Sequence, residues 1–172
     1  ASRAQSREPF AATGNYPITM TETETDVMIV GAGPTGLTLA VALATRGVHA
    51  TVIDRLGEGA NTSRAAVVHA RTLEVLEPLA VAPRLVERGL QARRFTIRDR
   101  DRVLVPIDFD RLPTRYPYTL MVSQAVTEAV LLDRLVELGG QVLRPRGFTG
   151  LTQDAAGVRV TLDDGSLWRA RL

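Results

Sequence analysis

Residues 26–55, DVMIVGAGPTGLTLAVALATRGVHATVIDR, constrain the fold of this chain more than any other stretch. Residues 27–30 form a short apolar run, which is typical of a strand buried on both faces. Apolar residues then recur at helical spacing over 35–46, and Gly47 ends this predicted helix. A second apolar run covers 48–53. The sequence therefore predicts a parallel, right-handed strand–helix–strand unit.

Three glycines between the first strand and the helix follow the pattern Gly-x-Gly-x-x-Gly of dinucleotide-binding loops. In this pattern Gly31 makes the tight turn out of the strand, Gly33 lets backbone approach a pyrophosphate, and Gly36 lets the helix lie against the sheet. Pro34 and Thr35 open the helix, whose free N–H groups and dipole would face the phosphates. The pattern predicts a dinucleotide site, and the alternative is that the glycines serve only close packing.

Asp54 ends the second predicted strand, eighteen residues after Gly36. A carboxylate at this position accepts hydrogen bonds from the hydroxyls of an adenosine ribose and repels the 2′-phosphate of NADP, so the loop favours FAD or NAD. Arg55, its neighbour, is a further candidate for cofactor binding. A solvated turn aspartate is the alternative interpretation of Asp54. The loop and its acid do not by themselves choose between FAD and NAD.

The rest of the chain continues an α/β pattern. The sequence predicts helices over 70–77, 79–88 and 125–138, a hairpin over 95–109, a strand over 118–122 and a β-meander over 141–172. The alternating Arg and Asp residues of the hairpin are interpreted as a solvated face. The predicted fold class is a Rossmann-like α/β dinucleotide-binding domain in three layers, with the meander packed over a parallel sheet.

Composition excludes several classes of chemistry. The formal net charge is +2 although the pI is about 9.6, because all 21 basic residues are Arg, so nucleic-acid binding is not indicated. Without Lys there is no P-loop and no Schiff base, and without Cys there is no disulfide or Cys-based zinc site. Two histidines, His49 and His69, are too few for a His-rich metal site. No apolar run reaches the roughly 18–20 residues of a membrane span, and the lack of Cys suits the cytoplasm.

The first nineteen residues lack periodicity and an apolar signal-peptide core, and Met20 follows them as a plausible natural start. Residues 1–19 are therefore expected to be an N-terminal extension, disordered or derived from cloning, and an Arg-rich organellar presequence is the alternative. Residues 20–172 are expected to form the domain.

A set of segments occurs in order along the chain: VGAGPTGLTLAVALATRGV, VIDR, SRAAVVHARTLEVLE, RYPYTLMVSQAVTEAVLLDRL and DDGSLWRA. Together they resemble the FAD-dependent aromatic hydroxylases, the class A flavin monooxygenases related to para-hydroxybenzoate hydroxylase, and most of all the branch that acts on phenols and polyketides. The resemblance covers about residues 26–172. It implies bound FAD, NADPH or NADH as a transient reductant, and a flavin hydroperoxide that hydroxylates a small aromatic substrate.

The resemblance also assigns roles to residues outside the glycine loop. Arg64, in the SRA segment, matches the arginine that approaches the FAD pyrophosphate, and Gln124 matches the glutamine that contacts the flavin side. Guanidinium pairs well with phosphate, and a neutral amide can bind ribityl hydroxyls. For each, an ordinary surface or helix-start residue is the alternative. Arg71 could reach the cofactor or simply cap and solubilise its helix.

Members of the family run to several hundred residues, and this chain stops at RARL, where further cofactor-binding segments and the substrate-binding sheet would follow. The sequence is therefore expected to be the N-terminal part of the FAD-binding domain, to lack the substrate domain, to name no catalytic group and to be inactive alone. A non-catalytic nucleotide-binding module or inactive remnant is the alternative from another class, and an NAD-dependent oxidoreductase is a third.

Overall fold

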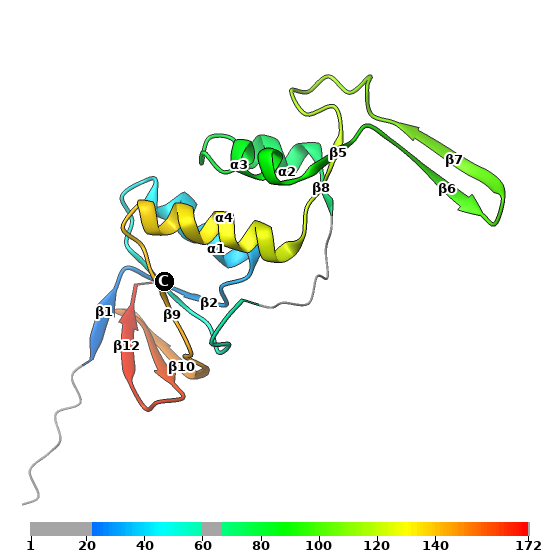
Figure 1. Ribbon diagram of the computed structural model, residues 1–172. Coiled ribbons are helices and arrows are strands. Elements are labelled where there is room, and N and C mark those ends of the chain that lie inside the picture. The colour runs from blue at the N-terminus through cyan, green and yellow to red at the C-terminus, as the bar shows by residue number, and fades with distance from the viewer. Residues whose placement is uncertain (1–21, 60–66, 172) are drawn as a thin grey trace, which may run out of the picture.

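The computed structural model describes residues 22–59 and 67–171. Four helices and twelve strands lie in these ranges (Figure 1). The helices are α1 (Pro34–Ala44), α2 (Ala70–Leu76), α3 (Ala82–Arg88) and α4 (Gln124–Glu137). The strands are β1 (Thr23–Thr25), β2 (Val27–Val30), β3 (Ala50–Ile53), β4 (Val67–Val68), β5 (Leu90–Ala92), β6 (Arg94–Asp99), β7 (Arg102–Asp108), β8 (Thr119–Met121), β9 (Val142–Leu143), β10 (Phe148–Asp154), β11 (Gly157–Leu162) and β12 (Leu167–Ala170).

The central sheet is parallel, with the strand order β2-β3-β9. Val27 of β2 pairs with Ala50 of β3, and Val30 pairs with Ile53, so the two strands end level with each other. The predicted strand–helix–strand unit is thereby confirmed. Its second strand begins at Ala50, two residues later than predicted. The carboxyl ends of all three strands consequently lie at one edge of the sheet, where ligands of open α/β sheets bind.

A second sheet has the order β1-β12-β11-β10. β10, β11 and β12 form an antiparallel meander, as predicted, and β1 adds to its edge in parallel with β12. One prediction in this region was wrong, and one strand was missed. β9, which the sequence placed in the meander, pairs with β3 instead, and β1 was not predicted because its residues Thr-Glu-Thr carry no apolar pattern.

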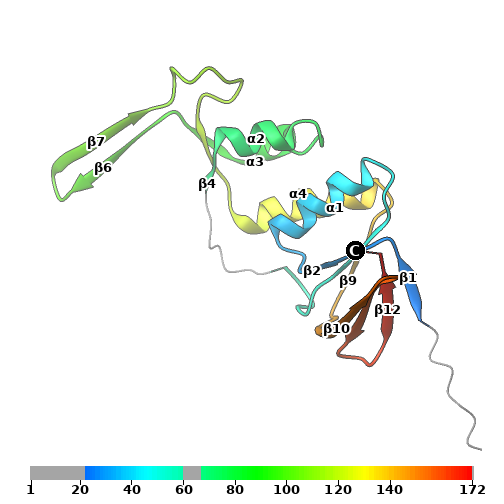
Figure 2. The same cartoon turned by 180° about the vertical axis from the view of Figure 1, so that it is seen from behind.

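Alternating side chains of the parallel sheet serve two separate cores. Ile29 and Val52 belong to the larger core, on the side of helices α1 and α4. Met28 and Ile53 point the other way and pack with Val160, Leu162 and Trp168 of the meander. Helices, parallel sheet and meander therefore form three layers, as Figures 1 and 2 show from opposite sides, and the predicted three-layer arrangement is confirmed.

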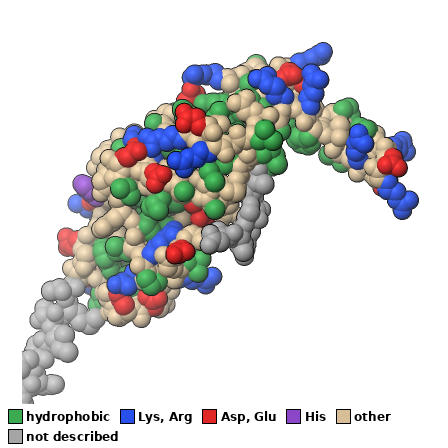
Figure 3. Space-filling model, viewed as in Figure 1, with side chains coloured by type: hydrophobic (Ala, Val, Ile, Leu, Met, Phe, Trp, Pro, Cys, Tyr) green, Lys and Arg blue, Asp and Glu red, His purple; other side chains and the backbone are tan. Residues whose placement is uncertain are grey.

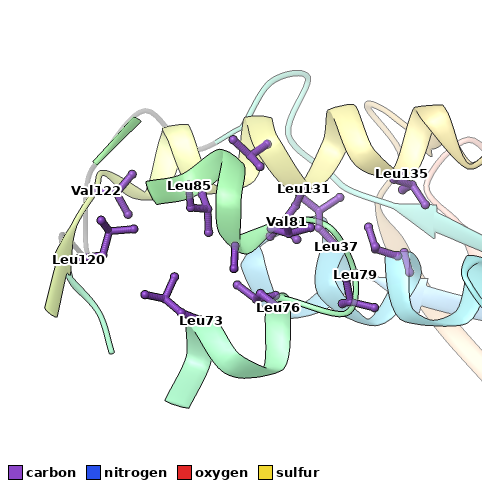
Figure 4. Close-up of a cluster of buried hydrophobic side chains, with 14 of the residues drawn as sticks. Leu37, Leu73, Leu76, Leu79, Val81, Leu85, Leu120, Val122, Leu131 and Leu135 are labelled. Atoms are coloured by element: carbon purple, nitrogen blue, oxygen red, sulfur yellow. The ribbon is translucent and has the colours of Figure 1, made fainter. Parts of the chain in front are cut away.

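Helices α1 and α4 lie side by side, and both have their N-termini at the same end (Figures 1 and 2). α2 and α3 cover α4 on the side away from the sheet, which adds a further layer. The shared core is built from aliphatic side chains that are almost fully buried (Figure 4). It includes Leu37, Leu73, Leu76, Val81, Leu85, Leu120, Leu131 and Leu135. The predicted helix 79–88 begins only at Ala82, since Leu79 to Val81 form the turn after α2.

An ion pair fixes α4 to α3, and a hydrogen bond fixes α4 to the turn between α2 and α3. Nη1 and Nη2 of Arg84 donate to the carboxylate of Glu137, at 2.6 and 2.8 Å, and Arg134 Nη1 donates to it at 3.0 Å. Arg134 Nε also donates to the carbonyl oxygen of Leu79, at 3.0 Å. Hydrogen bonds from Arg84 first, and then from Arg134, lower the pKa of Glu137 from 4.5 to about 2. α4, which begins at Gln124, is thus held at its C-terminal end.

Strands β6 and β7 form the predicted hairpin, which projects from the body (Figure 1). In the space-filling view basic and acidic side chains gather at its tip (Figure 3), where Arg100 and Asp101 make the turn and Arg98, Asp99 and Arg102 flank it. Along the shaft Phe95 and Ile97 are 40% and 48% exposed. The hairpin is therefore solvated at its tip, as predicted, but carries exposed apolar side chains along its length.

None of the helices in the described part of the chain has the length and apolar character that a membrane span requires.

We predict that the Glu137→Gln variant is less stable than the wild type near neutral pH and that this difference fades in acid. The pKa of Glu137 is about 2 in the folded chain, below its ordinary value of 4.5. The ion pairs therefore contribute their full stabilisation above about pH 4.5 and lose it as the pH falls toward about 2. Urea unfolding of both proteins from neutral pH downward measures the difference. The control is Glu24→Gln, whose carboxylate forms no hydrogen bond within the described part of the chain. A stability difference that does not change with pH would contradict the prediction.

Candidate cofactor-binding site

The glycine loop leaves β2 through a conformation that favours glycine. Gly31 has φ +102°, in the region that L side chains rarely adopt. Its N–H donates to the carbonyl oxygen of Ile53 at 2.8 Å, which extends the pairing of β2 with β3 by one residue. The chain then turns away from the sheet through Ala32, and Gly33 is the N-cap of α1. The first glycine therefore makes the turn that the sequence predicted for it.

The other two glycines of the loop have different surroundings. A Cβ atom on Gly36 would lie 2.0 Å from the carbonyl oxygen of Gly31 and 3.3 Å from Ile29 Cγ2, so only glycine allows the first turn of α1 to pass this close to β2. A Cβ atom on Gly33 would meet no heavy atom of the described chain within 4 Å. Gly36 thus serves packing inside the protein, and the space beside Gly33 is open to a ligand.

The N-terminus of α1 offers backbone donors to an anion. Gly33 has no side chain that could cap the helix, and Pro34 at the first helical position has no N–H group. The N–H groups of Thr35 and Gly36 lie in the first turn, where a helix has no intrahelical acceptor for them. No acidic residue occurs in this turn to compete for them. Together with the helix dipole, these groups suit a phosphate.

Asp54 lies directly beside the glycine loop. Its Oδ2 accepts the N–H of Ala32 at 2.7 Å, and its Oδ1 accepts the N–H of Leu56 at 2.9 Å. An ionised carboxylate has about four acceptor positions, so each oxygen can still accept a hydroxyl group. The backbone of Asp54 is fixed as well, because its N–H donates to the carbonyl oxygen of Leu143 at 3.1 Å and its carbonyl oxygen accepts the N–H of Arg146 at 2.7 Å. The structure therefore brings this predicted acid and the loop together.

Arg144 is a residue of this site that the sequence did not indicate. It follows β9, and its Nη2 donates to the carbonyl oxygen of Ala32 at 3.3 Å. Ala32 is thus held on both sides, by Asp54 at its N–H and by Arg144 at its carbonyl oxygen. The buried Nε of Arg144 has no hydrogen-bond partner among the described residues. Because β9 was assigned to the meander, its carboxyl end was not expected at this edge of the sheet.

Of the other predicted site residues, three lie within the described ranges. Gln124 is the first residue of α4, at the same end as the N-terminus of α1, and its Nε2 donates to Glu128 Oε1 at 2.7 Å. Arg55 is exposed next to Asp54. Arg64 lies outside the described residues. Arg71 is exposed and forms an ion pair with Glu74 of its own helix at 2.9 Å, which favours the solubilising interpretation.

Cavities on the surface of the described chain include two with different surroundings. One, of about 220 Å³, is next to the glycine loop, and its lining includes Leu37, Gly59, Glu128 and Arg144. A larger one, of about 600 Å³, lies at the amino ends of the parallel strands beside His49. We assign the cofactor site to the edge of the sheet that carries the glycine loop. The free N–H groups of α1 and the Asp54 carboxylate lie there, whereas the larger cavity is distinguished only by its volume.

The arrangement fits the ADP part of FAD: uncapped amides for a pyrophosphate, open space over Gly33, and a carboxylate with unused acceptor positions. The model of the FAD binding domain family matches residues 24–167. The chain belongs to this FAD-binding family. The predicted membership, Rossmann-like fold class and FAD cofactor are thereby confirmed.

Among curated proteins, this FAD-binding chain is 43% identical over 139 residues to an anhydrotetracycline monooxygenase of Streptomyces rimosus, covering 80% of the chain and 27% of that protein. It is 37% identical over 157 residues to a pentachlorophenol 4-monooxygenase of Sphingobium chlorophenolicum, covering 86% and 28%. Among solved structures, an anhydrotetracycline hydroxylase from Streptomyces rimosus has a TM-score of 0.78 and 37% identity, over 87% of the chain and 30% of that structure. The chain thus spans less than a third of the length of these relatives.

We predict that substitutions of two glycines in the loop, Gly36 and Gly33, differ in their effect on stability. Gly36→Ala forces a Cβ against the Gly31 carbonyl oxygen and should lower the free energy of unfolding by about 1–3 kcal/mol. Gly33→Ala adds a methyl group in open space at an ordinary φ of −78° and should change it by less than about 0.5 kcal/mol. Urea unfolding of both variants measures the two values. Equal losses of stability would show that the loop is not built as described.

Proposed function

We propose that this chain is the FAD-binding part of an FAD- and NAD(P)H-dependent monooxygenase that hydroxylates a phenolic or polyketide substrate. The names of its relatives support this reaction class. The two curated relatives are named as an anhydrotetracycline monooxygenase and a pentachlorophenol 4-monooxygenase. A solved relative, aklavinone-11 hydroxylase in complex with FAD and aklavinone, has a TM-score of 0.74 and 30% identity, over 88% of the chain and 32% of that structure. A small aromatic substrate is accordingly the proposed partner.

The observation that carries the proposal is the contact between Asp54 and the glycine loop. The carboxylate accepts the N–H of Ala32 at 2.7 Å, so it stands beside the open space at Gly33 and the free amides of α1. In the proposed complex the pyrophosphate lies over Gly33, Thr35 and Gly36. The adenosine ribose donates its hydroxyls to the remaining acceptor positions of Asp54. Gly31 and Pro34 shape this loop and its helix start.

Three further residues complete the proposed cofactor site. Arg55 adds positive charge beside Asp54, and Arg64 pairs with the pyrophosphate. Gln124, at the N-terminus of α4, contacts the flavin side through its neutral amide. When bound, FAD supplies the redox chemistry, with a reduced nicotinamide cofactor as electron donor and molecular oxygen as oxidant. The chain's own residues bind the cofactor and orient it. We place this function in the cytoplasm, where nicotinamide cofactors are available as reductants.

We predict that the Asp54→Ala variant of the 172-residue chain binds FAD about ten- to hundredfold more weakly than the wild type. The variant loses hydrogen bonds between the ribose and a charged acceptor, which contribute about 1.5–3 kcal/mol. Titration of FAD, followed by flavin fluorescence, measures the two dissociation constants. Because Asp54 also accepts the N–H groups of Ala32 and Leu56, urea unfolding of the variant is measured in parallel to separate binding from stability.

The control for this titration is Glu87→Ala, which removes an exposed carboxylate from α3. It should leave the dissociation constant for FAD unchanged. An unchanged constant for Asp54→Ala would remove Asp54 from the site. A wild-type chain that binds NAD in preference to FAD would contradict the proposed function itself.

A further inference from the structure

Glu128 is the one charged side chain that is buried among the described residues, with 7% of its surface exposed. It lies in the second turn of α4, on the side that faces α1 and the loop after β3. Burial of a carboxylate is costly unless polar partners compensate for it. Its hydrogen-bond partner in the described chain is Gln124, one turn earlier on the same helix. Glu128 is not among the residues proposed to bind the pyrophosphate, the ribose or the flavin.

The bond between the two residues determines which way the Gln124 amide points. Gln124 Nε2 lies 2.7 Å from Glu128 Oε1, a short distance for an N–H donor and a charged acceptor. An ionised carboxylate only accepts hydrogen bonds, so the reversed amide would place two acceptor oxygens against each other. The carbonyl oxygen of Gln124 and its second amide hydrogen are therefore directed elsewhere.

The loop after β3 lies close to the other oxygen of the Glu128 carboxylate. A Cβ atom on Gly59 would lie 2.9 Å from Glu128 Oε2 and 3.8 Å from Arg144 Nη1, so the loop after β3 passes close to the carboxylate with the guanidinium nearby. Arg144 also donates to the carbonyl oxygen of Ala32 in the glycine loop. The lining of the cavity of about 220 Å³ at this point includes Leu37 and Leu132, which limit water access to the carboxylate. Glu128 thus shares this cavity with Arg144, the residue that binds the glycine loop.

We propose that Glu128 is a positioning residue for FAD, which orients the Gln124 amide toward a hydroxyl-bearing part of the cofactor. A hydroxyl group can donate to the carbonyl oxygen of Gln124 and accept its second amide hydrogen, whereas phosphate oxygens only accept. The adenosine ribose is assigned to Asp54, so the hydroxyls that remain are those of the ribityl chain. This inference rests on the proposed function, because it requires that the chain binds FAD.

The test compares FAD with ADP, which lacks the ribityl chain and the flavin. Glu128→Met replaces the carboxylate acceptor with an apolar side chain of similar length, so Gln124 loses its fixed orientation. We expect this variant to bind FAD about five- to tenfold more weakly, the effect of about one hydrogen bond, and to bind ADP as the wild type does. Glu128→Gln, which can still pair with Gln124 but in either orientation, should be intermediate. Asp133→Asn, an exposed acid on the same helix, should bind both ligands unchanged.

A double-mutant cycle with Gln124→Ala separates positioning from a general structural effect. If Glu128 acts through Gln124, Glu128→Met has no further effect on FAD affinity once Gln124 is Ala. Additive losses, or equal losses for FAD and ADP, would overturn the inference. A wild-type chain that binds ADP but not FAD would also overturn it, together with the proposed function. If the wild type binds FAD and only Glu128→Met is without effect, the inference alone is wrong.

A measurement on the wild-type chain needs no variant at position 128 to fold. The side-chain amide of Gln124 is assigned in a ¹H–¹⁵N spectrum by its loss in Gln124→Ala. One of its two protons should be shifted downfield by the short bond to Glu128, and the other should move on addition of FAD but not of ADP. Two protons at the positions of a solvated amide would overturn the inference.

Discussion

The hydrogen bond from the N–H of Ala32 to the carboxylate of Asp54 joins the two parts on which the site depends. It connects the loop after β2 to the residue after β3, and it is possible only because Val30 and Ile53 end level in the parallel sheet. A shift of the strand register by one residue would exchange the sides of the sheet on which Ile29 and Met28 lie. The two hydrophobic cores therefore hold the register that brings the acid to the loop.

The second constraint is the common direction of α1 and α4. Their N-termini lie at the same end of the molecule, so two helix dipoles present their positive ends on the side of the glycine loop (Figure 1). α4 is anchored at its other end by the ion pair of Glu137 with Arg84 of α3 and by the hydrogen bond from Arg134 to the carbonyl oxygen of Leu79. These contacts lie far from the proposed FAD site and hold α4 against α3, while direct packing of α4 on α1 holds the start of α4, with Gln124 and Glu128, next to the glycine loop. A dinucleotide that spans both helix starts would gain from this rigidity because little ordering remains to be done on binding.

Elements and site residues that depend on local sequence patterns were predicted from the sequence, whereas those that depend on pairing between distant segments were not. β2, α1 and β3 were predicted because an apolar run, a helical repeat and three glycines all lie within thirty residues. β9 has only two residues and is followed by Arg-Pro, so its pairing with β3, across almost ninety residues of chain, leaves no local pattern. Arg144 was missed for the same reason. Glu128 did leave a signal, since it interrupts the buried side of α4 formed by Thr127, Val130 and Leu131, and an acid in such a position calls for a partner.

FAD is proposed to lie across the starts of α1 and α4, and chemical-shift mapping of the ¹⁵N-labelled chain tests this placement. On addition of FAD, the backbone amides of Gly33, Thr35 and Gly36 and the side-chain amide of Gln124 should show the largest shifts. The amides of His49 and Gly140, which line the larger cavity at the amino ends of the strands, should stay unchanged. Largest shifts at His49 and Gly140, with none in the glycine loop, would contradict this placement of FAD.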